Sequence, residues 1–152
     1  MSIFRLRTSP AVLIVATVPM WLSLMDTTIL NIGYGNIVSS LGATLDEVSW
    51  ASTAYTLAAI TTLPLAGWLV ARYGRKRVFL TILFLFTAGS MLCALATTAT
   101  QLGLFRLLQG FGGGLLGTVS QAIFLDAYPD EHRREAFNLL SVTVMVGPFL
   151  GP

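Results

Sequence analysis

Long stretches without a charged side chain restrict the fold of this sequence more than any other feature. Asp, Glu, Lys and Arg make up 11% of its 152 residues, against about 25% in an average soluble domain. Five mainly apolar segments contain none of these residues, namely 8–25, 48–71, 78–105, 107–125 and 136–152. Four of them reach the roughly 18 residues that a membrane-spanning helix needs, and the fifth nearly does. With 55% hydrophobic residues, the sequence predicts an all-α integral membrane protein and excludes a soluble globular domain.

The apolar runs place the expected helices near 11–33, 48–71, 78–97, 102–126 and 136–152. Five spans of about 20 residues with their connections use the whole length, so we expect residues 1–152 to form one membrane domain and no soluble domain. The first run follows two arginines, as in a signal peptide, but no small-x-small cleavage pattern comes after it. We therefore interpret it as a retained first helix.

Basic residues lie on alternate connections between these helices. Those that precede the first helix, or join the second to the third and the fourth to the fifth, are Arg5, Arg7, Arg72, Arg75, Lys76, Arg77, Arg133 and Arg134. The connections 34–47 and 98–101 contain no Lys or Arg. Because positive charge marks the cytoplasmic side of a membrane, we expect the N-terminus and both basic loops to be cytoplasmic.

Two charged residues, Asp26 and Arg106, fall inside the predicted helices. An ionisable group there costs about 2.5–3.5 kcal/mol on insertion scales, so such residues are functional candidates by default. At 1.5 Å per residue, Asp26 lies roughly 22 Å along the first helix from Ala11, and Arg106 lies about 6 Å from the outer end of the fourth helix at Leu102. The two depths agree, so we expect Asp26 and Arg106 to pair or to share a water-filled cavity.

A carboxyl group buried beside an arginine can exchange a proton. Burial favours the protonated acid and a neighbouring guanidinium favours the carboxylate, so a change of surroundings shifts the balance between them. Such a site can couple proton movement to substrate movement. The alternative is an ion pair that fixes helix packing and does nothing else.

Other residues share the faces that carry the two charges. They are Ser23, Thr27 and Asn31 on the first helix, and Gln109, Gly110, Gly113, Gly117, Ser120 and Gln121 on the fourth. A polar face inside a membrane should look at protein or water rather than at lipid. Glycines four residues apart let helix backbones approach closely, which is the plainer interpretation of the fourth-helix glycines.

Several other functions find no support in the sequence. The net charge of +2 does not indicate nucleic-acid binding, because no basic run lies on a polar surface. Cys93 is the single cysteine, so neither a disulfide nor a paired-cysteine metal site is expected. His132 has no second ligand and Ser120 has no nearby base, so an enzyme is not expected.

Four patterns, in this order along the chain, together resemble the major facilitator superfamily, in particular its fourteen-helix drug:proton antiporters of the EmrB/QacA type. They are LMDTTILNI at 24–32 in the first helix, GWLVARYGRKRVF at 67–79 in the loop between the second and third helices, FRLLQGFGGG at 105–114 in the fourth helix, and VGPFLGP at 146–152 in the fifth. PDEHRREA at 129–136 also matches the usual loop after the fourth helix. Ala71 stands where the loop pattern of the family has an acidic residue.

The resemblance implies the N-terminal portion of a proton-coupled multidrug efflux transporter, which exchanges inward-moving protons for outward-moving amphipathic compounds. It makes Asp26 the proton carrier and Arg106 its charge partner. The substrate path would include Thr27, Asn31, Gln109 and Gln121. The gating loop would use Gly67, Arg72, Gly74, Arg75 and Asp126, and the antiporter helix would bend at Gly147, Pro148, Gly151 and Pro152.

The resemblance also implies a setting. The protein would be a multi-pass protein of the bacterial cytoplasmic (inner) membrane, with the lipid bilayer, protons, amphipathic small molecules and accessory efflux proteins as partners. It would use no cofactor beyond the proton gradient. The family has two six-helix halves with the substrate site between them, so a missing C-terminal remainder is expected and residues 1–152 should be inactive alone.

Two alternatives remain from the sequence. One is a small four-helix multidrug exporter that works as an oligomer. The other is a non-transporting membrane protein that binds a partner through its glycine-rich fourth helix.

Overall fold

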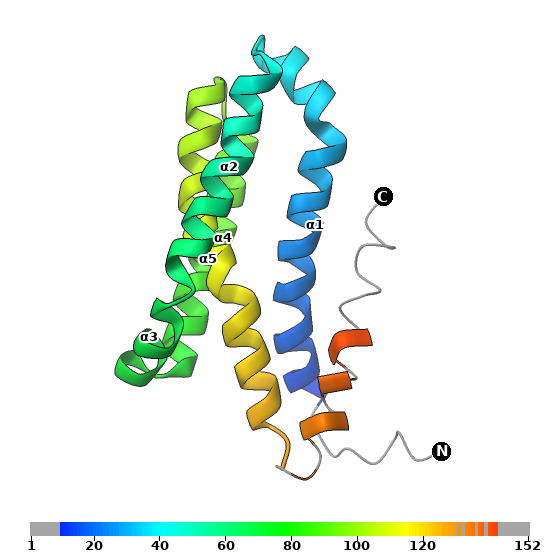
Figure 1. Cartoon of the computed structure of the whole chain (residues 1–152), viewed down its shortest axis with the longest axis vertical. Helices are drawn as coiled ribbons and strands as arrows, with labels where there is room; N and C mark the ends of the chain where they lie inside the picture. The colour runs from blue at the N-terminus through cyan, green and yellow to red at the C-terminus, as the bar shows by residue number, and fades with distance from the viewer. Residues whose placement is uncertain (1–9, 130, 132, 136, 139, 143–152) are drawn as a thin grey trace.

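The computed structural model describes residues 10–129, 131, 133–135, 137–138 and 140–142, without the side chains of residues 10–13 and 31. This part of the chain is a helical bundle (Figure 1). Its helices are α1 (Pro10–Leu41), α2 (Leu45–Thr62), α3 (Leu65–Tyr73), α4 (Arg75–Ala94) and α5 (Ala99–Asp126). Helix α5 lies between the others, packing extensively against α2 and α4 and also against α1. The buried charge pair described below lies between α5 and α1.

The turn between α1 and α2 is much shorter than the predicted connection 34–47. Helix α1 continues to Leu41 and ends at Gly42, whose φ of 58° suits a residue without a Cβ atom. The Ala43 amide then donates to the Val38 carbonyl at 3.1 Å, which is the hydrogen bond of a Schellman motif. The helix predicted over 11–33 thus ends eight residues later in the structure, because Gly33 and Gly35 lie within it and the left-handed glycine that ends it is Gly42.

A capping box starts α2 directly after this turn. The hydroxyl of Thr44 accepts the Glu47 amide at 3.3 Å, and the Glu47 carboxylate accepts the Thr44 amide at 2.8 Å. These reciprocal bonds satisfy two amide groups that the first helical turn would otherwise leave free.

The second predicted helix, 48–71, is two helices in the structure. Helices α2 and α3 meet at Pro64 and are inclined by 58°. Proline has no amide hydrogen, so it cannot bond to the Ile60 carbonyl, which instead accepts the Leu63 amide at 3.3 Å. The bend is therefore a proline break, which the apolar pattern alone did not reveal.

Gly74 joins α3 to α4 without a loop. It has a φ of 81°, its amide donates to the Val70 carbonyl at 3.0 Å, and its carbonyl accepts the Val78 amide at 3.2 Å. One residue thus closes α3 and opens α4 in a backbone conformation that favours glycine. The helices predicted over 78–97 and 102–126 each begin about three residues earlier in the structure, at Arg75 and Ala99.

The fifth predicted helix, 136–152, falls largely beyond the described part of the chain. Residues 137–138 and 140–142 are helical. The antiporter-helix residues Gly147, Pro148, Gly151 and Pro152 lie outside the described residues.

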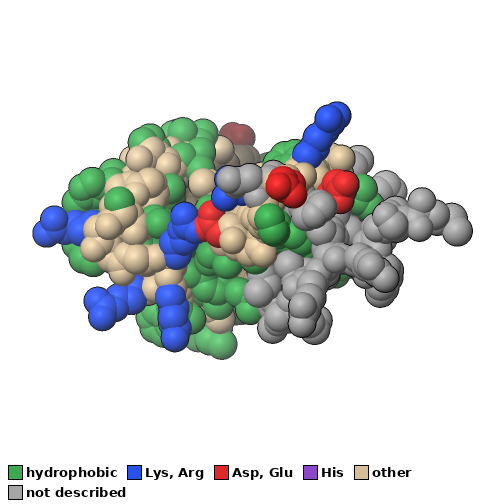
Figure 2. Space-filling view, turned by 90° about the horizontal axis from the view of Figure 1, so that it is seen from below, with side chains coloured by type: hydrophobic (Ala, Val, Ile, Leu, Met, Phe, Trp, Pro, Cys, Tyr) green, Lys and Arg blue, Asp and Glu red, His purple; other side chains and the backbone are tan. Residues whose placement is uncertain are grey.

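Within the described residues, α4 alone is long and apolar enough to cross a membrane as a single straight helix, with a mean hydropathy of 1.8. Up to three spans result if each bent pair, α2 with α3 and the two parts of α1 on either side of Asn31, counts as one. Figure 2 views the bundle from the end where α3 meets α4 and where α5 finishes, and Lys and Arg side chains gather on that face. The basic segments 72–77 and 133–134 belong to this end of the bundle.

Candidate functional site

A buried ion pair connects α1 to α5. Arg106 Nη1 donates to Asp26 Oδ2 at 2.6 Å, and the two side chains are only 9% and 13% exposed. The contact expected from their matching depths is present. A charge-assisted hydrogen bond of this length is among the stronger polar contacts in proteins, and it is the structural basis of the candidate site.

Gln109 completes the hydrogen bonding of Asp26. One turn along α5 from Arg106, its Nε2 donates to Asp26 Oδ1 at 2.9 Å, so both carboxylate oxygens accept a bond from α5. The Sγ of Cys93 on α4 donates to Gln109 Oε1 at 3.6 Å. A chain of polar contacts thus runs from α4 through α5 to α1, and Cys93 belongs to it.

Tyr55 of α2 lies beside Arg106 and also contacts α1. Its ring centroid lies 5.9 Å from Arg106 Cζ, which is within range of a cation–π contact. Its hydroxyl lies 3.3 Å from the Ser23 hydroxyl on α1. Arg106 Nε is buried and has no hydrogen-bond partner among the described residues. Sequence reasoning missed Tyr55, because an aromatic residue in an apolar run carries no signal of a polar role.

Two cavities reach the ion pair. One of about 520 Å³ lies between α1, α4 and α5, and Asp26, Cys93 and Arg106 line it. A second of about 170 Å³ lies between α1, α2 and α5, and Thr27, Tyr55 and Arg106 line it. Arg106 thus lines both cavities, and Asp26 lines the larger one, from which a small molecule or water could meet both members of the pair.

The glycines of α5 bring the neighbouring helices into backbone contact. A Cβ atom on Gly110 or Gly114 would overlap the backbone of α2, and one on Gly112 would lie 2.7 Å from the Ile82 carbonyl oxygen and the Phe86 nitrogen of α4. Gly89 of α4 faces the backbone at Gln109 in the same way. These contacts hold the polar side chains in place. They also leave little of the glycine-rich face of α5 free to bind a separate partner, which was the second alternative from the sequence.

The predicted substrate-path residues differ in their exposure and in whether they line a cavity. Thr27 is exposed, donates to the Leu24 carbonyl at 2.8 Å and lines the smaller cavity. Gln109 is fully buried and Gln121 half-buried, and neither lines the two cavities described above. The side chain of Asn31 lies outside the described part of the chain. The substrate-path role of all four stays a prediction.

The predicted gating residues meet at the basic end of the bundle. Arg75, at the start of α4, forms an ion pair with Asp126, the last residue of α5. The Arg72 guanidinium lies 5.8 Å from the Trp68 ring centroid and 5.7 Å from that of Tyr73. Gly74 has the left-handed backbone described above, whereas Gly67 lies inside α3 with no heavy atom within 4 Å of a Cβ position.

We expect the Arg75–Asp126 ion pair to add little stability, because the two side chains are 49% and 36% exposed. A double-mutant cycle with Arg75→Gln and Asp126→Asn should give a coupling of about 0–1 kcal/mol in unfolding experiments, as for other exposed pairs. The coupling should shrink further as salt is added. A coupling of about 3 kcal/mol, which is typical of buried pairs, would contradict this prediction.

Among the described residues, no group of three His, Cys, Asp or Glu side chains could hold a metal ion. The site can hold and release a proton at Asp26, and it can bind charged or polar groups of a ligand. Both require the same three side chains, Asp26, Arg106 and Gln109.

The chain is similar to curated proteins with names that refer to multidrug export or resistance. The chain is 36% identical to a Haemophilus influenzae protein named multidrug export protein EmrB over 132 residues, which are 87% of this chain and 26% of the relative. It is 39% identical to multidrug resistance protein 3 of Bacillus subtilis over 131 residues, or 86% of this chain and 25% of that protein. The chain thus spans about a quarter of the length of the curated relatives that it matches. Residues 18–152 match the profile of the Major Facilitator Superfamily, and the chain therefore belongs to that family as part of its N-terminal region.

Proposed function

We propose that this chain is the N-terminal part of a proton-coupled multidrug efflux transporter. The observation that carries the proposal is the buried Asp26–Arg106 ion pair, which lines a cavity of about 520 Å³ inside the bundle. The names of the relatives, a multidrug export protein and a multidrug resistance protein, support multidrug export as the activity. The family consists of transporters rather than enzymes, so no covalent chemistry is assigned to the site.

Asp26 is the proposed proton carrier. In its ionised form it accepts bonds from Arg106 and Gln109 and neutralises the guanidinium. A proton on either oxygen removes the negative charge and leaves Arg106 as a buried cation without a counter-ion, which is unfavourable. Protonation therefore favours a conformation in which Arg106 reaches water or an anionic group, and this dependence would couple the proton to movement of the helices.

The proposed orientation places the N-terminus and the basic end of the bundle in the cytoplasm. The Lys and Arg side chains on that face support it through the positive-inside rule (Figure 2). The Gly42 turn at the other end contains no Lys or Arg. With bacterial relatives, the proposed location is the bacterial cytoplasmic membrane.

The cytoplasmic end of the bundle carries the proposed gating residues. Arg72, Gly74, Arg75 and Asp126 join α3, α4 and α5 at the cytoplasmic end, where contacts with a second half of the transporter would form in one state and break in another. Accessory efflux proteins are proposed as further partners of the full-length protein.

The test is transport by the full-length protein in liposomes with an imposed pH gradient. We expect an amphipathic dye to accumulate only while the gradient exists, with protons moving in the opposite direction, and a protonophore to abolish accumulation. Residues 1–152 alone should give no accumulation, because one incomplete half cannot form a path between two halves. Dye accumulation that persists without any pH gradient would contradict proton coupling.

A further inference from the structure

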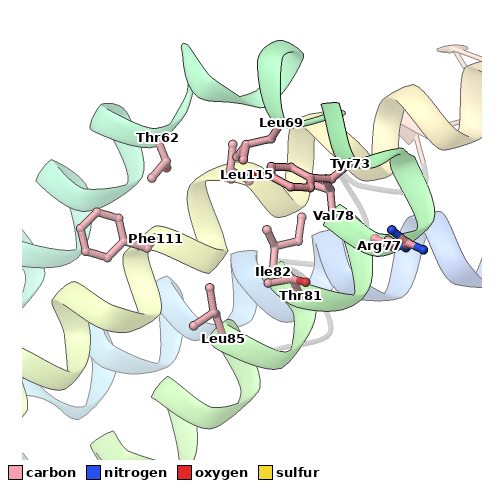
Figure 3. A pocket seen from close by; sticks show the side chains of 10 residues that line it. All are labelled: Thr62, Leu69, Tyr73, Arg77, Val78, Thr81, Ile82, Leu85, Phe111 and Leu115. Carbon is pink, nitrogen blue, oxygen red and sulfur yellow. The ribbon is translucent and has the colours of Figure 1, made fainter. Parts of the chain in front are cut away.

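A groove separate from the proton site lies beside the basic loop. It has a volume of about 490 Å³ and lies between α2, α3, α4 and α5 (Figure 3). It shares no lining residue with either cavity at the Asp26–Arg106 pair. The bend at Pro64 turns α3 away from the direction of α2, and the groove lies on this bend with Thr62 and Leu69 in its wall.

The wall of the groove is almost entirely apolar. Its side chains include Leu69, Ile82, Leu85, Phe111 and Leu115. The hydroxyl of Thr62 donates to the Ala58 and Ala59 carbonyls, so it is not free for a ligand. A wall of this kind suits an aliphatic chain rather than a polar molecule.

Positive charge lies at one end of the groove. Figure 3 shows Arg77 beyond Tyr73 and Val78, at the opposite end from Thr62 and Phe111. Arg75 is paired with Asp126, but neither Lys76 nor Arg77 has an acidic partner within the described part of the chain. The segment 67–79 contains no acidic residue of its own. An apolar groove thus ends at the Arg77 guanidinium, whose charge no acidic side chain among the described residues neutralises.

We propose that this groove binds an anionic phospholipid of the cytoplasmic leaflet, with one acyl chain between α3, α4 and α5 and its phosphate against Arg77. Basic side chains next to apolar surface at the cytoplasmic face attract anionic headgroups, and the buried acyl chain adds affinity through its methylene groups. The inference rests on the proposed orientation of the basic loop and is independent of proton coupling. Charge and shape together select the ligand, because a phosphatidylcholine fits the groove but carries no net charge.

Native mass spectrometry of the purified full-length protein tests the headgroup. The protein is titrated with palmitoyl-oleoyl phosphatidylglycerol and, separately, with phosphatidylcholine of the same acyl chains. We expect the first phosphatidylglycerol to bind more tightly, and Arg77→Gln to reduce that preference about fivefold, the factor for one basic residue near an anionic surface. Arg134→Gln removes the same charge from another cytoplasmic segment and should leave the preference unchanged. An unchanged preference in Arg77→Gln would overturn the proposal.

A second pair of variants tests the acyl-chain site. Thr81 lines the groove, whereas Thr87 is an exposed residue of the same helix that does not line it. We expect Thr81→Trp to fill the groove and weaken binding of both lipids, and Thr87→Trp to bind both as the unaltered protein does. If Thr81→Trp binds both lipids as tightly as the unaltered protein does, the proposal is wrong. That result is expected if another part of the polypeptide occupies the groove. Because Asp26→Asn should leave lipid binding intact, the lipid site and proton coupling can fail separately.

Discussion

Replacing Asp26 by Asn in the full-length protein is expected to reduce pH-gradient-driven transport to the level of protein-free liposomes. Asparagine has nearly the same shape and can still accept a hydrogen bond from Arg106, but it cannot carry a proton at neutral pH. Substrate binding should survive and lose its dependence on pH, because the group that titrates is gone. The measurement is dye accumulation in liposomes together with equilibrium dye binding at several pH values.

The matched control for this variant is Asp46→Asn. Asp46 is exposed in the first turn of α2, so its replacement changes the net charge equally without touching the ion pair. It should transport as the unaltered protein does. If Asp26→Asn kept its pH-gradient-driven accumulation, the pair would be a packing device alone, which is the plainer interpretation of a buried ion pair.

A methyl group on Gly112 is expected to destabilise the bundle. The added Cβ would lie 2.7 Å from both the Ile82 oxygen and the Phe86 nitrogen. Both are backbone atoms of α4, so neither can rotate away and the helices must separate. Such overpacking costs typically about 1–3 kcal/mol. Gly112→Ala should therefore lower the apparent melting temperature of the purified full-length protein by several degrees in a thermal-unfolding assay.

Gly117→Ala is the control for Gly112→Ala on the same helix. A Cβ atom at Gly117 would meet no heavy atom within 4 Å. Alanine also favours helix by about 1 kcal/mol over glycine, so this variant should be as stable as the unaltered protein or more stable. Equal melting temperatures for both variants would show that the contact between α4 and α5 is looser than the structure indicates.

The contact between Asp26 and Arg106 could be predicted from the sequence because depth along a helix follows from the rise per residue alone. The family could also be predicted, since four short motifs in a fixed order carry it. The shared face of Arg106 and Gln109 followed from their spacing of three residues. That spacing could not show which side of α5 meets α1. Gln109 was expected to line a cavity, whereas in the structure its side chain is buried and donates to Asp26.

Other features depended on tertiary contacts that no local pattern reports. Pro64 was expected inside one continuous helix, because neighbouring helices can compensate a proline break, yet the chain bends there by 58°. The end of α1 was placed at Gly33 rather than Gly42, since only the backbone conformation distinguishes a glycine within a helix from one that ends it. Gly112 carried no signal either, because it faces α4, whereas Gly110, Gly113 and Gly114 face α2.

The glycine contacts of α5 also determine how this part of the protein can move. Side-chain interfaces can slide by exchanging rotamers, but α5 touches α2 through backbone at Gly110 and Gly114. A shift of one turn would bring Arg106 or Thr118 into a space that admits no Cβ atom. We therefore expect α2, α4 and α5 to move together as one rigid body during a transport cycle. When this rigid body tilts against a second half of the transporter, the gap between them widens at one end of the bundle and narrows at the other.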